Sequence, residues 1–108
     1  MAETYKPIAQ SAPSATTLTD LYTVPANTSS VVSRLVVCNR GAAGTFRIAV
    51  SPLGAAIVNA HYVYYDCPLG VGESKEVLSG MTLQATDKVR VYASHVDMGF
   101  SMFGSLIT

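Results

Sequence analysis

The residues of this chain best suited to hold a metal ion are its two histidines and two cysteines: His61, His95, Cys38 and Cys67. A zinc site needs three or four such ligands, and usually two of them lie only a few residues apart. No C-x-x-C or H-x-x-x-H spacing occurs in the sequence. We therefore interpret one histidine as a strand-end residue and the other as a loop residue, and we predict no metal site.

The two cysteines are also the candidates for nucleophilic catalysis, which requires a thiolate activated by a neighbouring base. Cys38 lies in a strongly apolar run, where thiols are usually buried and inert. Cys67 precedes Pro68 at the expected end of a strand and should be more exposed. Neither cysteine has a sequence context typical of a nucleophile. We predict two reduced thiols, with a bridge between them as the alternative.

Carboxylates could support hydrolysis of a glycoside if two of them faced each other across a groove. Asp66 and Asp87 both lie at expected strand ends, where aspartate usually accepts hydrogen bonds from the backbone of a turn. Residues 70–72 (GVG) lack the third glycine and the helix of a nucleotide-binding loop, so they are interpreted as a turn. The sequence thus predicts a protein that is not an enzyme, has no catalytic residue and needs no cofactor.

Six tyrosines, with no tryptophan, point to a surface that binds other molecules. Tyr62, Tyr64, Tyr65 and Tyr92 could form a platform for a sugar or contact a protein partner, because aromatic side chains are enriched in both kinds of site. We favour a protein interface and the core over a sugar site.

The composition limits the partners that this chain can have. Its 108 residues suffice for one domain with its own core, and seven basic residues balance seven acidic ones. Phosphate binding needs a clustered excess of Lys and Arg, so we predict no nucleic-acid partner. No apolar run approaches the about 20 residues of a membrane span, and no apolar signal core begins the sequence, so we predict no membrane partner and synthesis in a cytosol.

The low content of charged residues bears on whether the surface of this chain is covered by other subunits. Only 13% of the residues are charged, whereas monomer surfaces usually carry about a quarter or more. Interface cores are depleted of charge, so we expect other subunits to cover part of this surface. The alternative is a compact sandwich with a surface rich in Ser and Thr.

Short runs of alternating apolar and polar residues, separated by proline, glycine and asparagine, are typical of strands joined by tight turns. The inward residues of the two clearest runs are Phe46, Ile48, Val50, Val89, Val91 and Ala93. No stretch of ten residues shows a helical period. We predict an all-β fold, a single-domain antiparallel β-sandwich of seven to nine short strands, for which jelly-roll connections are one option.

The run at residues 30–39 differs because both of its faces are apolar. Strict alternation places on one face Val31, Leu35 and Val37, and on the other Val32, Val36 and Cys38. Such a strand is covered on both sides. A chain of this length can hardly supply a third layer, so the second cover is expected to be a partner subunit.

Two segments depart from the strand pattern. Residues 1–17 are polar, contain two prolines and are predicted to form an extended N-terminal arm, with a short edge strand near residues 6–10, before a β-sandwich domain at residues 18–108. Residues 52–60 (PLGAAIVNA) form a helical turn or a projecting loop. The predicted partner contacts lie in these two segments and in the aromatic strand at 61–67: Tyr5, Ile8, Ile57, Val58, Tyr62 and Tyr64.

Three stretches of strand and turn residues carry a resemblance to a known class of protein: YTVPANT at 22–28, VVCNRG at 36–41 and LQATDKVRVYAS at 83–94. In this order they resemble small virion structural proteins of tailed bacteriophages, and the resemblance extends over residues 8–108. It includes no catalytic motif.

The resemblance implies a β-sandwich that repeats on a virion assembled in the host cytoplasm. The expected place is the capsid, where a cement (decoration) protein stabilises the head by bridging major capsid protein subunits, commonly as a homotrimer. A tail fibre or baseplate accessory protein for host attachment is one alternative, and a carbohydrate-binding module is another. Small size, neutral charge and the lack of a coiled-coil or collagen-like shaft favour the cement role.

Overall fold

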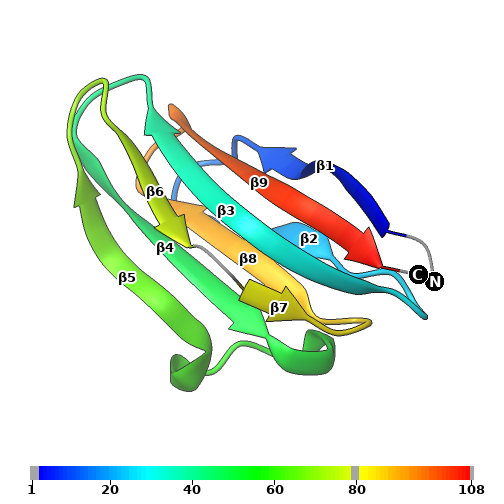
Figure 1. Cartoon of the computed structure of the whole chain (residues 1–108). Coiled ribbons are helices and arrows are strands. Elements are labelled where there is room, and N and C mark those ends of the chain that lie inside the picture. The colour runs from blue at the N-terminus through cyan, green and yellow to red at the C-terminus, as the bar shows by residue number, and fades with distance from the viewer. Residues whose placement is uncertain (1–2, 79–80, 108) are drawn as a thin grey trace.

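The computed structural model describes residues 3–78 and 81–107, and the side chains of residues 3–7, 59, 78 and 81 fall outside this description. Two antiparallel β-sheets pack face to face, which confirms the predicted all-β sandwich (Figure 1). Among the described residues the helical structure is limited to two 3₁₀ turns, η1 (Pro52–Gly54) and η2 (Asn59–His61).

The strands follow one another as β1 (Glu3–Ser11), β2 (Thr19–Thr23), β3 (Ser29–Asn39), β4 (Gly44–Ser51), β5 (Tyr62–Leu69), β6 (Ser74–Leu78), β7 (Met81–Leu83), β8 (Lys88–Ala93) and β9 (Met98–Ile107). The five-stranded sheet has the order β1-β9-β3-β6, with β7 also paired to β3. The four-stranded sheet has the order β2-β8-β4-β5. With β6 and β7 counted as one interrupted strand, successive strands alternate between the sheets except at the β4–β5 hairpin, which is the topology of a jelly roll.

The core lies between the two sheets and receives apolar side chains from both. Its largest fully buried members are Phe46, Phe100, Leu35, Ile48, Leu83, Met98 and Met102. The predicted alternation is confirmed in β8, where every second residue is buried and the intervening ones lie on the outer face. In β4 the predicted inward residues Phe46 and Ile48 are buried and the half-buried Val50 packs against the core, but Ala49 and Ser51 are fully buried as well, so the alternation in exposure ends at Ile48.

A bulge in β3 changes which residues share a face. The register against β9 shifts between Val32 and Arg34. An extra residue in a strand reverses the alternation beyond it. Val32, Leu35 and Val37 are therefore all fully buried. The prediction that Val31 lies on the same face as Leu35 and Val37 is wrong.

The residues predicted to form an arm contribute a strand to the sandwich. β1 pairs with β9 from Glu3 opposite Ile107 to Ser11 opposite Phe100, with a register shift between Pro7 and Ala9. It occupies the edge of its sheet, where a proline without an N–H donor is tolerated. Residues 3–11 thus lie along the domain instead of extending away from it.

Candidate functional site

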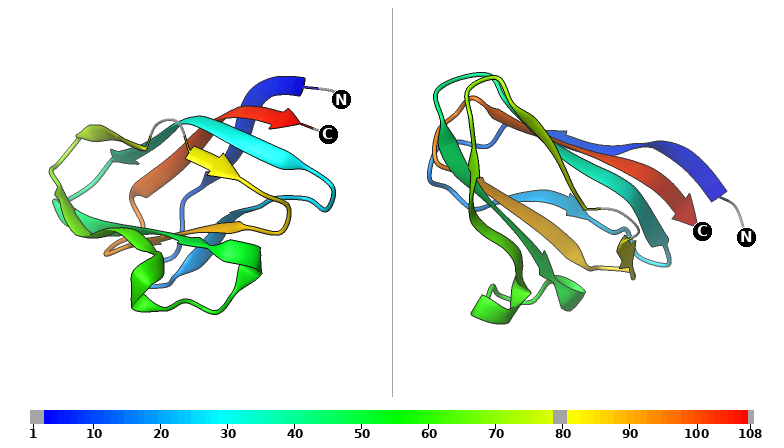
Figure 2. Two further views of the ribbon diagram at one scale, coloured as in Figure 1. Left: turned by 60° about the horizontal axis from the view of Figure 1, so that its bottom comes forward. Right: turned by 60° about the vertical axis from the view of Figure 1, so that its left-hand side comes forward.

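The outer face of the five-stranded sheet is open in both views of Figure 2, where β1, β9 and β3 form an outer layer of the molecule. Among the described residues, the apolar side chains on this face include Val31, Val36 and Phe103, all half-buried. A hollow of about 370 Å³ lies at the β3 bulge and is lined by Ser33, Arg34, Val36 and Phe103. We call this outer face, with its hollow, the open face.

The bulge that shapes the hollow is held by its own side chains. Ser33 Oγ donates a hydrogen bond to the backbone oxygen of Phe103, 3.1 Å away. Arg34 lies opposite Phe103 in the ladder, and its Nε is 3.4 Å from Glu76 Oε2 on β6. Both members of this ion pair are about half exposed, so the pair contributes little to folding and is available to other partners.

The outer face of the four-stranded sheet is organised around Arg47 on β4. The Arg47 guanidinium lies between two rings, 4.2 Å from the centre of Tyr65 and 4.4 Å from that of Tyr92. Its Nε donates a 2.6 Å hydrogen bond to Asp66 Oδ1, and its second nitrogen approaches Asp66 Oδ2 at 3.3 Å. The hydrogen bond to Asp66 raises the pKa of Arg47 further above its ordinary value, so Arg47 keeps its charge at any physiological pH.

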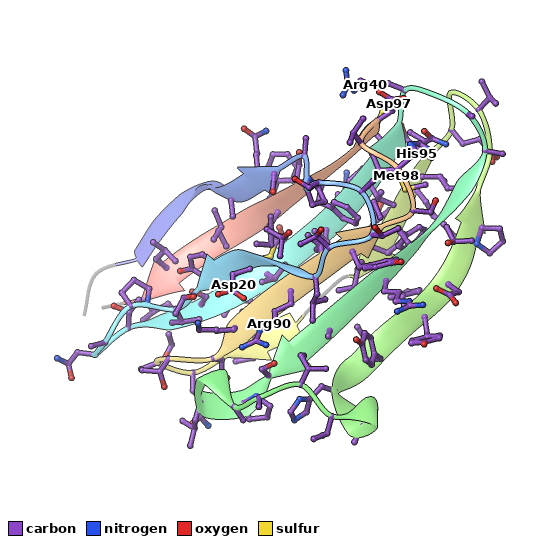
Figure 3. All side chains as sticks on the ribbon, turned by 180° about the vertical axis from the view of Figure 1, so that it is seen from behind. Asp20, Arg40, Arg90, His95, Asp97 and Met98 are labelled. Carbon is purple, nitrogen blue, oxygen red and sulfur yellow. The ribbon has the colours of Figure 1, made fainter. Side chains whose placement is uncertain are left out.

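The same face carries a second group of paired charges. Lys88 Nζ is 3.0 Å from Asp20 Oδ2, and Arg90 Nε is 3.1 Å from Asp20 Oδ1. The contact of Arg90 Nε with Asp20 is an ion pair but not a hydrogen bond, because the N–H group does not point at the carboxylate oxygen. Figure 3 shows Asp20 and Arg90 side by side across β2 and β8. The charges of this sheet therefore bind one another within the chain.

This arrangement argues against a sugar platform. A sugar stacks on a free aromatic face. One face of Tyr65 is covered by Arg47, and its ring also meets Tyr62 edge-on with centres 5.1 Å apart. Tyr92 is half-buried and likewise covered by Arg47. Tyr65 is still 57% exposed, but Arg47 covers one of its two ring faces, and Tyr92 is half-buried, so the two rings do not form a free platform.

The segment between β4 and β5, residues 52–61, projects from the end of the four-stranded sheet (Figure 1). We call it the apolar loop, because Leu53 is 73% exposed and Val58 is 54% exposed. Leu53 has a positive φ of 55° within η1, and its N–H is bound by Asp87 Oδ1 at 2.8 Å. The loop is thus held in a defined conformation while its apolar side chains face solvent.

The predicted partner contacts divide into three groups. Ile57 is half-buried and Val58 exposed, both on the apolar loop. Ile8 packs against the core, and the side chain of Tyr5 lies outside the described residues. Strict alternation would place Tyr62 and Tyr64 on one face of their strand, but they lie on different faces, because the β4–β5 register shifts between the residues opposite them.

Tyr64 is a structural residue of the core rather than a surface contact. It lies opposite Ile48, and its ring packs 6.1 Å from that of Phe46. Its hydroxyl donates a hydrogen bond to the backbone oxygen of Val77 on β6. Tyr64 therefore ties the two sheets together at the β5–β6 side of the sandwich.

The residues considered for chemistry are far apart or locally bound. No group of three His, Cys, Asp or Glu residues that could hold a metal occurs in the described part of the chain. His61 accepts a hydrogen bond from the N–H of Val58, and His95 bonds the backbone oxygen of Ala42, so the two lie near opposite ends of β4.

Both thiols are free, but their exposure is the reverse of the prediction. Cys38 is exposed because the β3 bulge turns it onto the open face, whereas Cys67 is half-buried and packs against the core.

The two aspartates singled out in the sequence have different roles. Asp87 is a turn residue as predicted, since its carboxylate accepts hydrogen bonds from the N–H groups of Gln84 and Leu53 at 2.9 and 2.8 Å. Asp66 lies within β5, with a positive φ of 49°, and binds Arg47. The turn interpretation of Asp66 is wrong because β5 continues past it to Leu69.

The end of the sandwich opposite the apolar loop is fixed by Asn39. The Nδ2 of this fully buried side chain lies within hydrogen-bond distance of the backbone oxygens of Ala42, Leu69 and Gly70, which share its two N–H groups, and its Oδ1 accepts the N–H of Gly41 at 3.0 Å. It thus joins the β3–β4 loop to the β5–β6 loop. Figure 3 shows the neighbouring Arg40, His95 and Asp97 gathered at this end.

Sequence reasoning missed the surface residues that long-range pairing creates. Phe103 lies opposite Arg34, and no local feature of the sequence indicates this pairing. Leu53 is not among the predicted contacts, although an apolar residue between proline and glycine is a usable signal of an exposed turn. Arg47 could not be found, because its partner Asp66 is 19 residues away.

No family model, no curated protein and no solved structure matches this chain. Within the described residues, no helix has the length and hydropathy needed to cross a membrane.

Proposed function

We propose that this protein is a virion structural protein of a tailed bacteriophage, and that it acts as a cement protein on the head. The resemblance of residues 8–108 to small virion proteins supports the proposal. The jelly roll is compatible with it, since capsid proteins use this topology, but lectins and cupins do so too. The fold by itself therefore does not decide the function.

The observation that carries the proposal is the apolar loop. Leu53 and Val58 are exposed on a segment that the hydrogen bond from Leu53 to Asp87 holds in place. Burying one such side chain against a shell subunit is worth about 1.5–3 kcal/mol. A shell binds many copies, so a modest contact from each is enough to reinforce the joints between capsid subunits.

The alternatives draw less support from the residues. A carbohydrate-binding module needs exposed ring faces, and Arg47 covers one face each of Tyr65 and Tyr92. A tail fibre or baseplate accessory protein would use the same loop on a different partner. Only the position of the protein on the particle separates that alternative from the cement role.

The position can be measured on purified particles that carry this protein. Osmotic shock releases DNA, and gradient centrifugation then separates heads from tails, each probed with an antibody to the chain. We expect the protein in the head fraction, together with the major capsid protein. Recovery with the tails, and heads that lack it, would contradict the cement role.

The loop contact can be tested separately with Val58→Asp. A charge at this position has to be desolvated when the loop is buried, so we expect reduced occupancy on heads that otherwise bind added wild-type protein. Val96→Asp is the matched control, because Val96 is 57% exposed but lies in the β8–β9 connection. Equal occupancy of the two variants, each with a wild-type circular dichroism spectrum, would exclude the apolar loop as the contact.

A further inference from the structure

The two outer faces of the sandwich differ in charge. The four-stranded sheet places five charged side chains on its outer face: Asp20, Arg47, Asp66, Lys88 and Arg90. Among the described side chains, the open face of the five-stranded sheet carries Arg34 and Glu76, which pair with each other. Lys75 lies opposite the inward-facing Val37 and therefore points to the other side of its strand. The outer face of the four-stranded sheet combines these charges with the exposed Val63 and Tyr65, whereas the described side chains of the open face are depleted of charge, as interface cores are.

The open face also exposes what an interface would bury. Val31, Val36 and Phe103 are only half-buried there, and Cys38 is exposed beside Gly99, which has no atom within 4 Å of its missing side chain. The five strands of this sheet have three to eleven residues each and lie about 4.8 Å apart, so together they offer about 600 Å² per copy. A pair of such faces buries about 1,200 Å², the lower end of the range for specific interfaces.

From these observations we infer that the open face is the contact surface for a second copy of this chain, related to the first by a twofold axis. The charged residues of the open face are complementary to themselves under such an axis. In a twofold contact, if one residue of the first copy touches a second residue of the other copy, the reverse contact forms as well. Arg34 of each copy then reaches Glu76 of the other, and both ion pairs form between chains.

The same charges disfavour a partner of different chemistry. Among the described side chains of this face, Arg34 and Glu76 balance each other, so a strongly acidic or basic partner would have to bury charges there without a counterion. Two such sheets can pack about 10 Å apart, and the hollow of about 370 Å³ at the bulge gives the partner's side chains room to interdigitate. The inference goes beyond the proposed function and does not depend on it.

The test uses the full chain in sedimentation equilibrium, with charge reversals on the open face. In Arg34→Glu, residue 34 meets Glu76 of the partner, and in Glu76→Arg, residue 76 meets Arg34. Each single variant should therefore pair at least about tenfold more weakly than wild type. Lys75→Glu is the control, because it reverses a charge one position away on the opposite side of β6, and it should pair like wild type.

Mixing the two variants distinguishes contacts between chains from contacts within one chain. A glutamate-rich copy then faces an arginine-rich copy, both interchain pairs are restored, and native mass spectrometry should show the heterodimer. As an independent measure, the Cys38 thiol of a Cys67→Ser chain should become protected from a maleimide as the protein concentration rises.

We expect the wild-type protein to form a dimer in which Cys38 is protected. Each single charge reversal should weaken the dimer, and mixing the two variants should restore it. Several results would overturn the inference: a monomer at the highest concentration, a mixture that stays unpaired, single variants that pair normally, or a Cys38 that remains reactive. A trimer, which the resemblance implies, would also overturn it, because a trimer uses head-to-tail contacts. None of these results bears on whether the protein is found with heads or tails.

Discussion

Asn39 shows how a single polar residue determines one end of the molecule. Its side chain is fully buried, and it satisfies three backbone oxygens from two loops that are about 30 residues apart in sequence. Buried backbone carbonyls without a donor are costly. The position of both loops therefore depends on this amide.

Replacement of Asn39 by alanine should lower the free energy of unfolding by about 2–4 kcal/mol, because the carbonyls that share its two N–H groups and the N–H of Gly41 lose their partner. Asn39→Asp should be no milder at neutral pH, since a carboxylate cannot donate to the carbonyls. Urea denaturation measures both variants. The control is Arg40→Ala, which removes an exposed neighbouring side chain and should change stability little; equal stability of Asn39→Ala and wild type would show that the amide is dispensable.

At the scale of the strand, the sequence predicts faces well only where no bulge occurs. β8 follows the expected alternation throughout and β4 follows it as far as Ile48, and their inward residues could be named in advance. In β3 and β5 an extra residue reverses the alternation, which moved Cys38 outward and separated Tyr62 from Tyr64. A bulge is defined by the register against a partner strand, and that register is set by residues far away in sequence.

Two glycines in β9 give a matched test of how closely the strands approach. A side-chain carbon on Gly104 would collide with the backbone oxygen of Val31 and lie 3.0 Å from Val32 Cα, whereas at Gly99 it would meet no atom within 4 Å. Gly104→Ala should therefore destabilise the fold by about 1–3 kcal/mol. Gly99→Ala should be neutral or stabilising by up to about 1 kcal/mol, since glycine is unfavourable in a strand.

Thermal unfolding followed by circular dichroism decides between them. A Gly104→Ala variant as stable as Gly99→Ala would mean that β3 and β9 can separate at this point without cost. Such a result would also weaken the case for a rigid open face, because β3 and β9 form its centre.

At the scale of the whole molecule, composition and fold class were readable and the strand order was not. Short alternating runs and a low charge content indicated a sandwich with a covered surface. The order β1-β9-β3-β6 depends on pairings between residues up to about a hundred positions apart, which leave no local signal. The apolar loop could be anticipated from Ile57 and Val58, while the open face required the register of β3 against β9.

The few charged side chains of this protein are unevenly distributed over its surface. The outer face of the four-stranded sheet keeps its charges in internal pairs, whereas the open face and the apolar loop present apolar groups to solvent. If the open face pairs two copies, the dimer carries two apolar loops. A protein with two such loops has the property that it needs in order to bridge two subunits of a shell.

We propose that this chain is a head protein present in many copies. The number of copies on the particle tests this proposal most directly. Absolute quantification by mass spectrometry with isotope-labelled peptides gives the ratio of this chain to the major capsid protein in purified virions. The cement role predicts a fixed ratio in which the two proteins are comparable in number. A few copies per particle, as for a tail accessory protein, or none at all, would contradict it.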